Sequence, residues 1–110
     1  MPPESASPFP SAEEAWFWTM ACLAARRDGE RRADSATVIR PCEPDDVVKA
    51  LDRLYRQRRI ELGHARILRI WGERGTAPDP QVRTQKGDAR LWREAMDALG
   101  PVLRAKGIVR

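Results

Sequence analysis

The fold is decided by residues 44–71, PDDVVKALDRLYRQRRIELGHARILRIW. Pro44 is typical of a first helical position, because a proline there loses no hydrogen bond, and Asp45 and Asp46 suit the positive end of the helix dipole. Apolar residues then recur at every third or fourth position. This spacing predicts a helix that begins at Pro44 and ends at about Arg58.

The same periodicity resumes after a tight corner at residues 60–63 and predicts another helix, which ends at Gly72 or Gly75. Because the connection is short, the two helices are expected to lie side by side or to cross steeply.

The residues before this stretch predict one more helix and a leader. Ser11 and Glu14 form a capping box, in which the serine hydroxyl accepts a hydrogen bond from the amide three residues on and the glutamate reaches back. The helix then continues to about Asp28, and Gly29 supplies a left-handed exit. Residues 1–10 contain four prolines and are expected to form a flexible Pro-rich leader.

The residues after this stretch predict a loop and a last helix. Two glycines, two prolines and little apolar content indicate a mobile loop at about 75–87. Asp88 is expected to cap a further helix. Gly100 and Pro101 are expected to break or kink that helix before a last turn at 102–106.

Together these elements predict an all-α fold, a single small domain of four to five helices over residues 11–110. One alternative stays open. The run 36–40, ATVIR, is the best candidate for an extended segment. It would form a short two-stranded element by joining 37–39 to 82–84 or to 108–109.

Charge is distributed unevenly along the chain. The formal net charge is +4, but residues 1–48 carry −4, residues 49–74 carry +5 and residues 75–110 carry +3. Seventeen of the 20 basic residues are arginines, so any recognition of phosphate or carboxylate would use the planar, bidentate guanidinium group. The positive charge therefore belongs to the middle and the end of the chain.

The arginines of the middle segment form the first candidate site, which we call the basic corner. It consists of Arg53, Arg56, Arg59, Arg66 and Arg69, on both sides of the predicted turn between two helices. Two such helices can lie along a phosphate backbone, or place one helix in a major groove. Two observations favour a merely solvated face instead. Cations at the end of a helix suit its dipole, and the turn lacks the glycine that is common in helix-turn-helix sequences.

The second candidate site is the aromatic run Trp16, Phe17 and Trp18. Consecutive helical residues point about 100° apart, so the three rings cannot share one face of a helix. Either the rest of the domain encloses this helix, or one aromatic face is exposed and binds a second copy or a larger protein.

The sequence carries no motif of an enzyme or of a cofactor site. Cys22 and Cys42 fit no structural zinc spacing, and His64 is the only histidine. A thiol and imidazole pair would need a cysteine beside His64, and no local signature accompanies either cysteine. We therefore expect no catalytic residue, no metal and no cofactor, and both cysteines as small buried apolar groups.

No membrane segment is expected, because the longest apolar run, residues 15–25, is shorter than the ~20 residues that span a bilayer. The N-terminus opens with prolines and acids and does not resemble a secretory signal, which favours a cytoplasmic location.

Four segments complete the sequence pattern: EEAWFW at 13–18, RPCEPDD at 40–46, LWREA at 91–95 and KGIV at 106–109. As a set they resemble small uncharacterised helical proteins of GC-rich alphaproteobacterial genomes, over most of residues 11–109. The resemblance implies a bacterial, cytoplasmic protein and supplies no activity or site.

The sequence thus predicts a small, non-enzymatic regulatory protein that binds nucleic acid through the basic corner. The alternative is a protein-interaction module or a homo-oligomer that docks through the aromatic face of the first helix.

Overall fold

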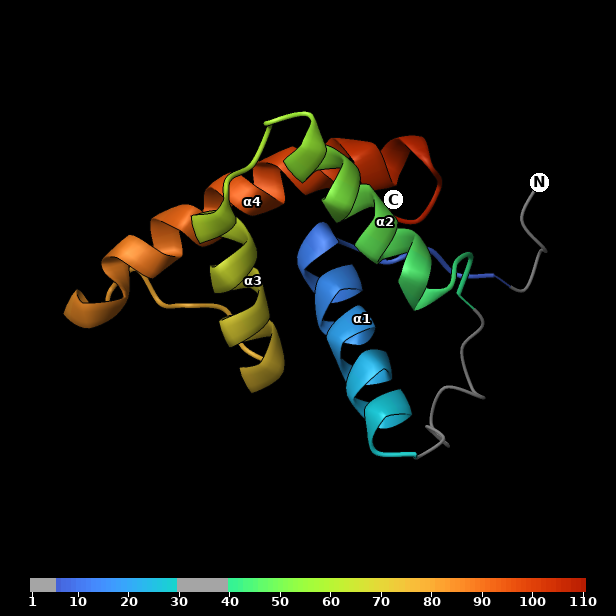
Figure 1. Ribbon diagram of the computed structural model, residues 1–110, viewed down its shortest axis with the longest axis horizontal. Helices are drawn as coiled ribbons and strands as arrows, with labels where there is room; N and C mark the ends of the chain where they lie inside the picture. Colours follow the sequence, from blue (N-terminus) through green and yellow to red (C-terminus); the bar gives the residue numbers. More distant parts are fainter. Residues whose placement is uncertain (1–5, 30–39) are drawn as a thin grey trace.

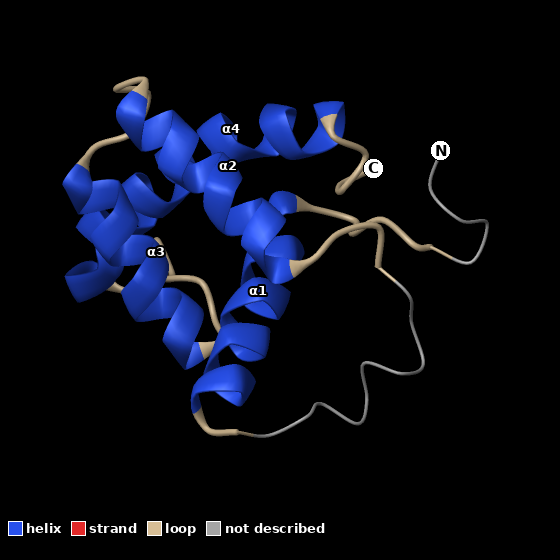
Figure 2. Ribbon diagram, turned by 45° about the vertical axis from the view of Figure 1, so that its right-hand side comes forward, coloured by secondary structure: helices blue, strands red, loops and turns tan. Residues whose placement is uncertain are grey.

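Four α-helices make up most of the described part of the chain, residues 6–29 and 40–110 of the computed structural model. They are α1 (Ala12–Arg27), α2 (Pro44–Arg56), α3 (Leu62–Arg74) and α4 (Lys86–Ala105), and a short 3₁₀ segment, η2 (Arg83–Gln85), leads into α4. Figure 2 shows helices and loops, and no strand, over these residues. The predicted all-α fold is confirmed.

Helix α1 begins and ends through the signals expected at its two ends. The side-chain oxygen of Ser11 accepts a hydrogen bond from the backbone amide of Glu14 at 3.2 Å. Gly29 has a φ of +75°, a left-handed backbone that glycine adopts at little cost. The helix therefore stops after Arg27.

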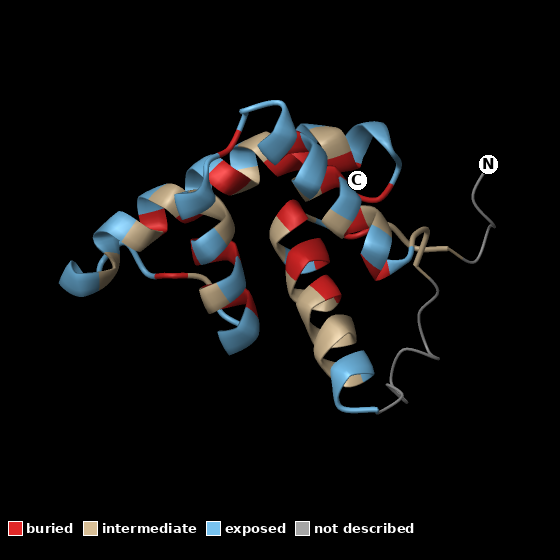
Figure 3. Ribbon diagram, in the orientation of Figure 1, coloured by how far each residue is buried: buried red, intermediate tan, exposed pale blue. Residues whose placement is uncertain are grey.

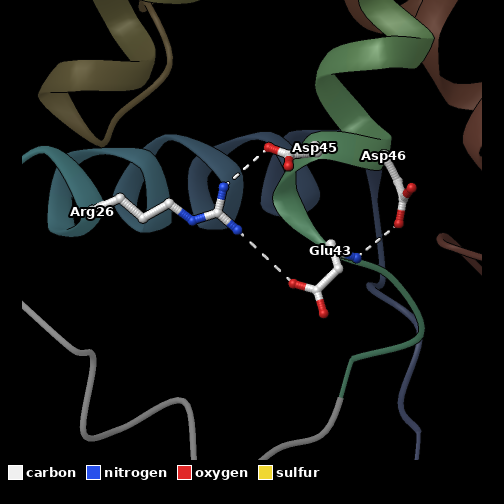
Figure 4. Close-up of polar contacts among 4 residues, drawn as sticks. All are labelled: Arg26, Glu43, Asp45 and Asp46. Atoms are coloured by element: carbon white, nitrogen blue, oxygen red, sulfur yellow. Dashed lines mark hydrogen bonds and ion pairs between the residues drawn. The ribbon is translucent and has the colours of Figure 1, made fainter.

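The beginning of α2 is held by carboxylates that act within the helix and across to α1. The backbone amide of Glu43 donates a hydrogen bond to the Asp46 carboxylate at 2.8 Å, and Pro44 occupies the first helical position. Arg26, in the last turn of α1, reaches Asp45 at 3.0 Å and Glu43 at 3.9 Å (Figure 4). The end of α1 is thereby tied to the beginning of α2.

The core lies where α1 meets the other three helices. Helix α2 rises to the corner and α3 descends from it, α1 packs against both, and α4 lies across α2 and α3 (Figure 1). Figure 3 shows the buried residues on the faces that the helices turn toward one another. The largest fully buried apolar side chains are Phe9, Leu54, Leu68, Leu99, Leu103, Ile108 and Val47.

Three tryptophans join elements that are distant in the sequence through their ring N–H groups. Trp16 donates to the Leu68 carbonyl at 2.8 Å, Trp71 to Asp88 at 3.0 Å and Trp92 to Glu13 at 2.9 Å. An indole N–H that leaves water needs such a partner. These three bonds therefore fix α1 to α3, α3 to α4 and α4 to α1.

Helices α1 and α3 approach each other closely at Gly72, which is buried inside α3. A Cβ atom at this position would lie 2.7 Å from Met20 Cγ and 2.7 Å from Trp16 Nε1. Only a glycine leaves enough room for the Trp16 ring at this crossing.

The flexible leader predicted over residues 1–10 is wrong at Phe9. Phe9 is only 1% exposed and pairs with Val109 in an isolated parallel bridge. Its amide donates to the Ile108 carbonyl at 2.9 Å, and its carbonyl accepts from the Arg110 amide at 3.0 Å. The prolines prevent a helix here, but they leave the Phe9 amide and ring free to bind the end of the chain.

The cap predicted at Asp88 is wrong, and so is a break of α4 at Pro101, whereas a kink there stays a prediction. The helix begins at Lys86, so Asp88 lies inside it and accepts the Trp71 hydrogen bond instead of capping the N-terminus. Pro101 does not break the helix, which continues to Ala105. Pro101 and Asp97, four residues earlier, are both exposed, so water can bind the carbonyl that loses its intrahelical partner.

The predicted loop at about 75–87 is a loop as far as Val82 and then becomes η2 and the first turn of α4. The possible strand pairing with 82–84 is absent, because this segment enters η2. Residues 30–39, which include the extended candidate at 37–39, lie outside the described residues. In the described part of the chain, Val109 pairs with Phe9.

Candidate nucleic-acid interface

The basic corner lies on two consecutive helices and the turn between them. Arg53 and Arg56 belong to the end of α2, Arg59 to the turn, and Arg66 and Arg69 to the first two turns of α3. All five are exposed. The turn stands at the upper edge of the molecule in Figure 1 and is largely pale blue in Figure 3. The corner is thus an outer surface and takes no part in the core.

Most of these guanidinium groups have no acidic partner. Arg56 forms an ion pair with Asp52, one turn earlier in α2, at 3.0 Å. Arg53, Arg59, Arg66 and Arg69 have no carboxylate within 4.0 Å in the part of the chain that the structure describes. An exposed pair such as that of Arg56 contributes about 0.3–0.5 kcal/mol, so a phosphate can replace Asp52 at little cost. The whole corner is therefore available to an anion.

The end of α2 adds a sixth arginine to this surface through an unusual backbone. The amide of Arg58 donates to the Tyr55 carbonyl at 3.0 Å, and the next amide, that of Arg59, donates to Leu54 at 2.9 Å. This pair of bonds is a Schellman turn, whose central residue must be left-handed. Arg58 accordingly has a φ of +59°, the only positive φ of a non-glycine residue among those described.

The other helices end in this conformation on glycines, Gly29, Gly75 and Gly107. A left-handed backbone costs an L-residue roughly 1–2 kcal/mol, and such strain is concentrated at functional sites. In the sequence, the missing glycine counted against a nucleic-acid interface. In the structure, Arg58 occupies the position that a glycine would take and adds one more guanidinium group to the corner. Arg58 was not among the predicted site residues. The signal for it was its position two residues after the end of α2, where a helix commonly ends with a left-handed residue.

An exposed apolar surface lies directly beside the arginines. Tyr55 is 47% exposed and Leu62 is 60% exposed. Tyr55 recurs at helical spacing with Val47 and Leu54 in the sequence of α2, but only the latter two are buried. Tyr55 and Leu62 line a hollow together with Arg56 and Arg58. Aromatic, apolar and cationic groups therefore share one surface.

The aromatic run of α1 is used largely inside the domain. Trp16 is buried, with 4% of its surface exposed. Phe17 is half-buried and stacks on Trp92, with 5.5 Å between ring centroids. Trp18 is also half-buried, and its ring packs against Phe9 at 5.1 Å. Trp16 is therefore removed from any docking surface, and docking through Phe17 and Trp18 stays a prediction.

A groove of about 440 Å³ runs between the C-terminal half of α1 and the end of α3. Phe17, Met20 and Leu23 line it from α1, and Gly72 and Glu73 line it from α3. Of the aromatic run Trp16, Phe17 and Trp18, only Phe17 lines this groove.

His64 is engaged by two glutamates and not by a thiol. Its Nδ1 accepts a hydrogen bond from the Glu61 amide at 3.0 Å, which leaves Nε2 to donate to the Glu94 carboxylate at 2.9 Å. The ring thereby caps the beginning of α3 and links it to α4. The structure gives this imidazole a structural role in place of the pairing with a cysteine that was considered.

Both cysteines are unoxidised and half-buried, which is less burial than expected from the sequence. Burial raises the pKa of the Cys42 thiol to about 11, and the carboxylates of Asp46 and Glu43 act in the same direction. The thiolate is the nucleophilic form, so Cys42 is a weak nucleophile near neutral pH.

Among residues 6–29 and 40–110, no three histidine, cysteine or carboxylate side chains gather as metal ligands. In the same residues, no helix combines the length and the hydropathy needed to span a bilayer. Comparison with known proteins finds no matching family model, no matching curated protein and no matching solved structure. The resemblance to alphaproteobacterial proteins therefore stays an expectation from the sequence.

Proposed function

We propose that this chain is a small nucleic-acid-binding protein that contacts the phosphate backbone through the basic corner and Arg58. The observation that carries the proposal is a set of exposed guanidinium groups on two consecutive helices and the turn between them, of which only Arg56 has an acidic partner. Residues 53–69 contain six arginines and one acid, Glu61. A phosphate chain is the ligand that suits such a surface, because arginine binds phosphate through two parallel hydrogen bonds.

The contrast with the opposite end of α2 supports this interpretation. At the beginning of the helix, Glu43 and Asp45 neutralise Arg26. At its end, Asp52 pairs with Arg56 alone, and the arginines that follow it have no such partner in the described structure. The dipole of α2 favours cations at the end of that helix. It does not account for Arg66 and Arg69, which lie on the next helix and add to a cluster of like charges that repel each other.

Replacing Arg56, Arg59 and Arg66 together by glutamine is expected to weaken nucleic-acid binding and to flatten its dependence on salt. Each phosphate contact contributes about 0.9 to the slope of log Kobs against log salt for duplex DNA, and about 0.7 for a single strand. Three lost contacts should therefore reduce the slope by about 2–3. Fluorescence anisotropy of labelled 20-mers from 0.05 to 0.3 M KCl measures it.

The matched control is the triple variant Arg83→Gln, Arg104→Gln and Arg110→Gln, which removes the same charge from exposed arginines outside the corner. We expect its slope to stay within about 1 of the original. Equal reductions in both triple variants would show that net charge, and not the basic corner, binds nucleic acid, and absence of binding by the unchanged protein would end the proposal.

Arg58→Gly is expected to stabilise the fold while weakening binding. Relief of the left-handed strain, roughly 1–2 kcal/mol, exceeds the added entropy of an unfolded glycine, roughly 0.4–1 kcal/mol. The free energy of unfolding in urea should therefore rise by about 0.5–1 kcal/mol. Arg59→Gly is the control: it removes the same charge one residue later, where φ is not positive, and should lower stability. A loss of stability in Arg58→Gly would contradict the strain assigned to this turn.

A further inference from the structure

An apolar groove separates α2 from α3 beside the basic corner. Its lining residues are Val48, Leu51, Asp52 and Tyr55 of α2, Ile60 of the turn, and Leu62 and Ala65 of α3. Its volume is about 320 Å³, at the lower end of the ~300–1,000 Å³ typical of small-ligand pockets. Asp52 is the only charged residue among those that line it. The groove is thus built to hold a small, uncharged and largely apolar group.

The groove and the arginines belong to one continuous surface. Tyr55, Ile60 and Leu62 line both the groove and the neighbouring hollow, and Arg56 and Arg58 line that hollow together with one acid, Glu61. A ligand that fills the groove and also meets these arginines must therefore carry an apolar or flat part next to an anionic part. A nucleotide has this composition: the base is flat and uncharged, and the phosphate follows one backbone step away.

We propose that the groove accepts an unpaired nucleobase, stacked on Tyr55, so that the protein binds single-stranded nucleic acid in preference to the duplex. This inference rests on the proposed function. In a duplex the faces of the bases are covered by their neighbours, and neither Tyr55 nor Leu62 could reach them. Proteins that bind single strands combine a cationic track for phosphates with aromatic side chains for bases, and both are present here.

The position of Asp52 favours a base over an acidic amphipathic helix, the other ligand that a cationic rim and an apolar groove could attract. A helix of that kind would bring carboxylates along the groove and against Asp52. A base brings no charge there. Arg56 and Arg58 line the hollow that adjoins the groove, and a phosphate that follows the bound base would meet them there.

Tyr55→Leu and Tyr55→Phe separate stacking from simple apolar contact. The first keeps an apolar side chain and removes the ring, and the second keeps the ring. We expect Tyr55→Leu to weaken binding of a labelled 15-nucleotide single strand about tenfold, with duplex binding of the same sequence unchanged. Tyr55→Phe should bind both as the original protein does. Anisotropy at a fixed salt concentration gives the four affinities, and thermal unfolding shows whether each variant is folded.

A strand with abasic sites in place of bases tests the ligand directly, since its phosphates are unchanged. The original protein should bind it about as weakly as Tyr55→Leu binds the natural strand. Equal affinity for the abasic and natural strands, or an unchanged affinity in Tyr55→Leu, would overturn the base groove while leaving phosphate binding intact. The base groove would also be overturned if an acidic amphipathic peptide displaced the strand and the affinity of that peptide depended on Tyr55. Absence of binding to any strand or duplex would instead remove the proposed function itself.

Discussion

Phe9→Ala is expected to lower the free energy of unfolding by about 3–5 kcal/mol, the usual loss for truncating a buried phenylalanine. The ring is 1% exposed, packs against Trp18, and lies under the Arg40 guanidinium group, which is 4.1 Å from its centroid. Alanine keeps both backbone hydrogen bonds of this position, so the loss reports the side chain alone. Urea unfolding followed by tryptophan fluorescence measures it.

Pro10→Ala is the control, because the adjacent Pro10 is exposed. We expect it to change the free energy of unfolding by less than about 0.5 kcal/mol. If Phe9→Ala has an equally small effect, the segment before α1 is not part of the core in solution, and the leader predicted from the sequence would be correct after all.

Gly72→Ala is expected to lower the free energy of unfolding by about 1–3 kcal/mol, the typical effect of forcing an extra group into a packed core. The new Cβ would lie 2.7 Å from Trp16 Nε1, so the indole must move. Its hydrogen bond to the Leu68 carbonyl, now 2.8 Å, would lengthen or break. Near-ultraviolet circular dichroism should report the displaced indole, and urea unfolding the lost stability.

Gly63→Ala is the matched control in the same helix. No atom lies within 4 Å of its would-be Cβ. Alanine there should raise the free energy of unfolding by about 0.5–1 kcal/mol, because glycine in a helix is less favourable than alanine by that amount. Effects of the same sign in both variants would show that the contact between α1 and α3 at Gly72 is looser than described.

The helix ends could be predicted wherever one local interaction sets them. Ser11, Pro44 and Gly75 act on backbone groups within a few residues, and each marks a helix end in the structure. Phe9 could not be predicted in this way, because its burial depends on Val109, 100 positions further along the chain. Prolines exclude a helix over these residues, but they do not indicate which residues far along the chain will contact Phe9.

The errors in α4 have a similar origin. Asp88 is a good cap by residue type, but the hydrogen bond offered by Trp71 decides its role. Pro101 is a helix breaker by type, but its position on the exposed side of α4 makes the missing bond inexpensive. In both cases the deciding information is which side of the helix faces the domain.

The candidate site was partly visible in the sequence. Charge counting found the five arginines of the basic corner, since clustering along the chain is enough to bring them to two consecutive helices and the turn between them. It could not show which of them lack an acidic partner, because that depends on side-chain geometry. The exposure of Tyr55 was hidden for another reason: helical spacing groups it with the apolar residues of α2, and only the packing of α1 and α4 decides which of these are covered.

The bridge between Phe9 and Val109 also bears on how the chain is made. A growing polypeptide leaves the ribosome from its N-terminus, so α1 emerges early and its neighbours follow. Phe9, however, lacks its backbone partners until residues 108–110 have been synthesised and released from the exit tunnel. The domain must therefore complete its folding after translation of this segment, and a message interrupted before codon 108 would yield a product with an unfinished interior.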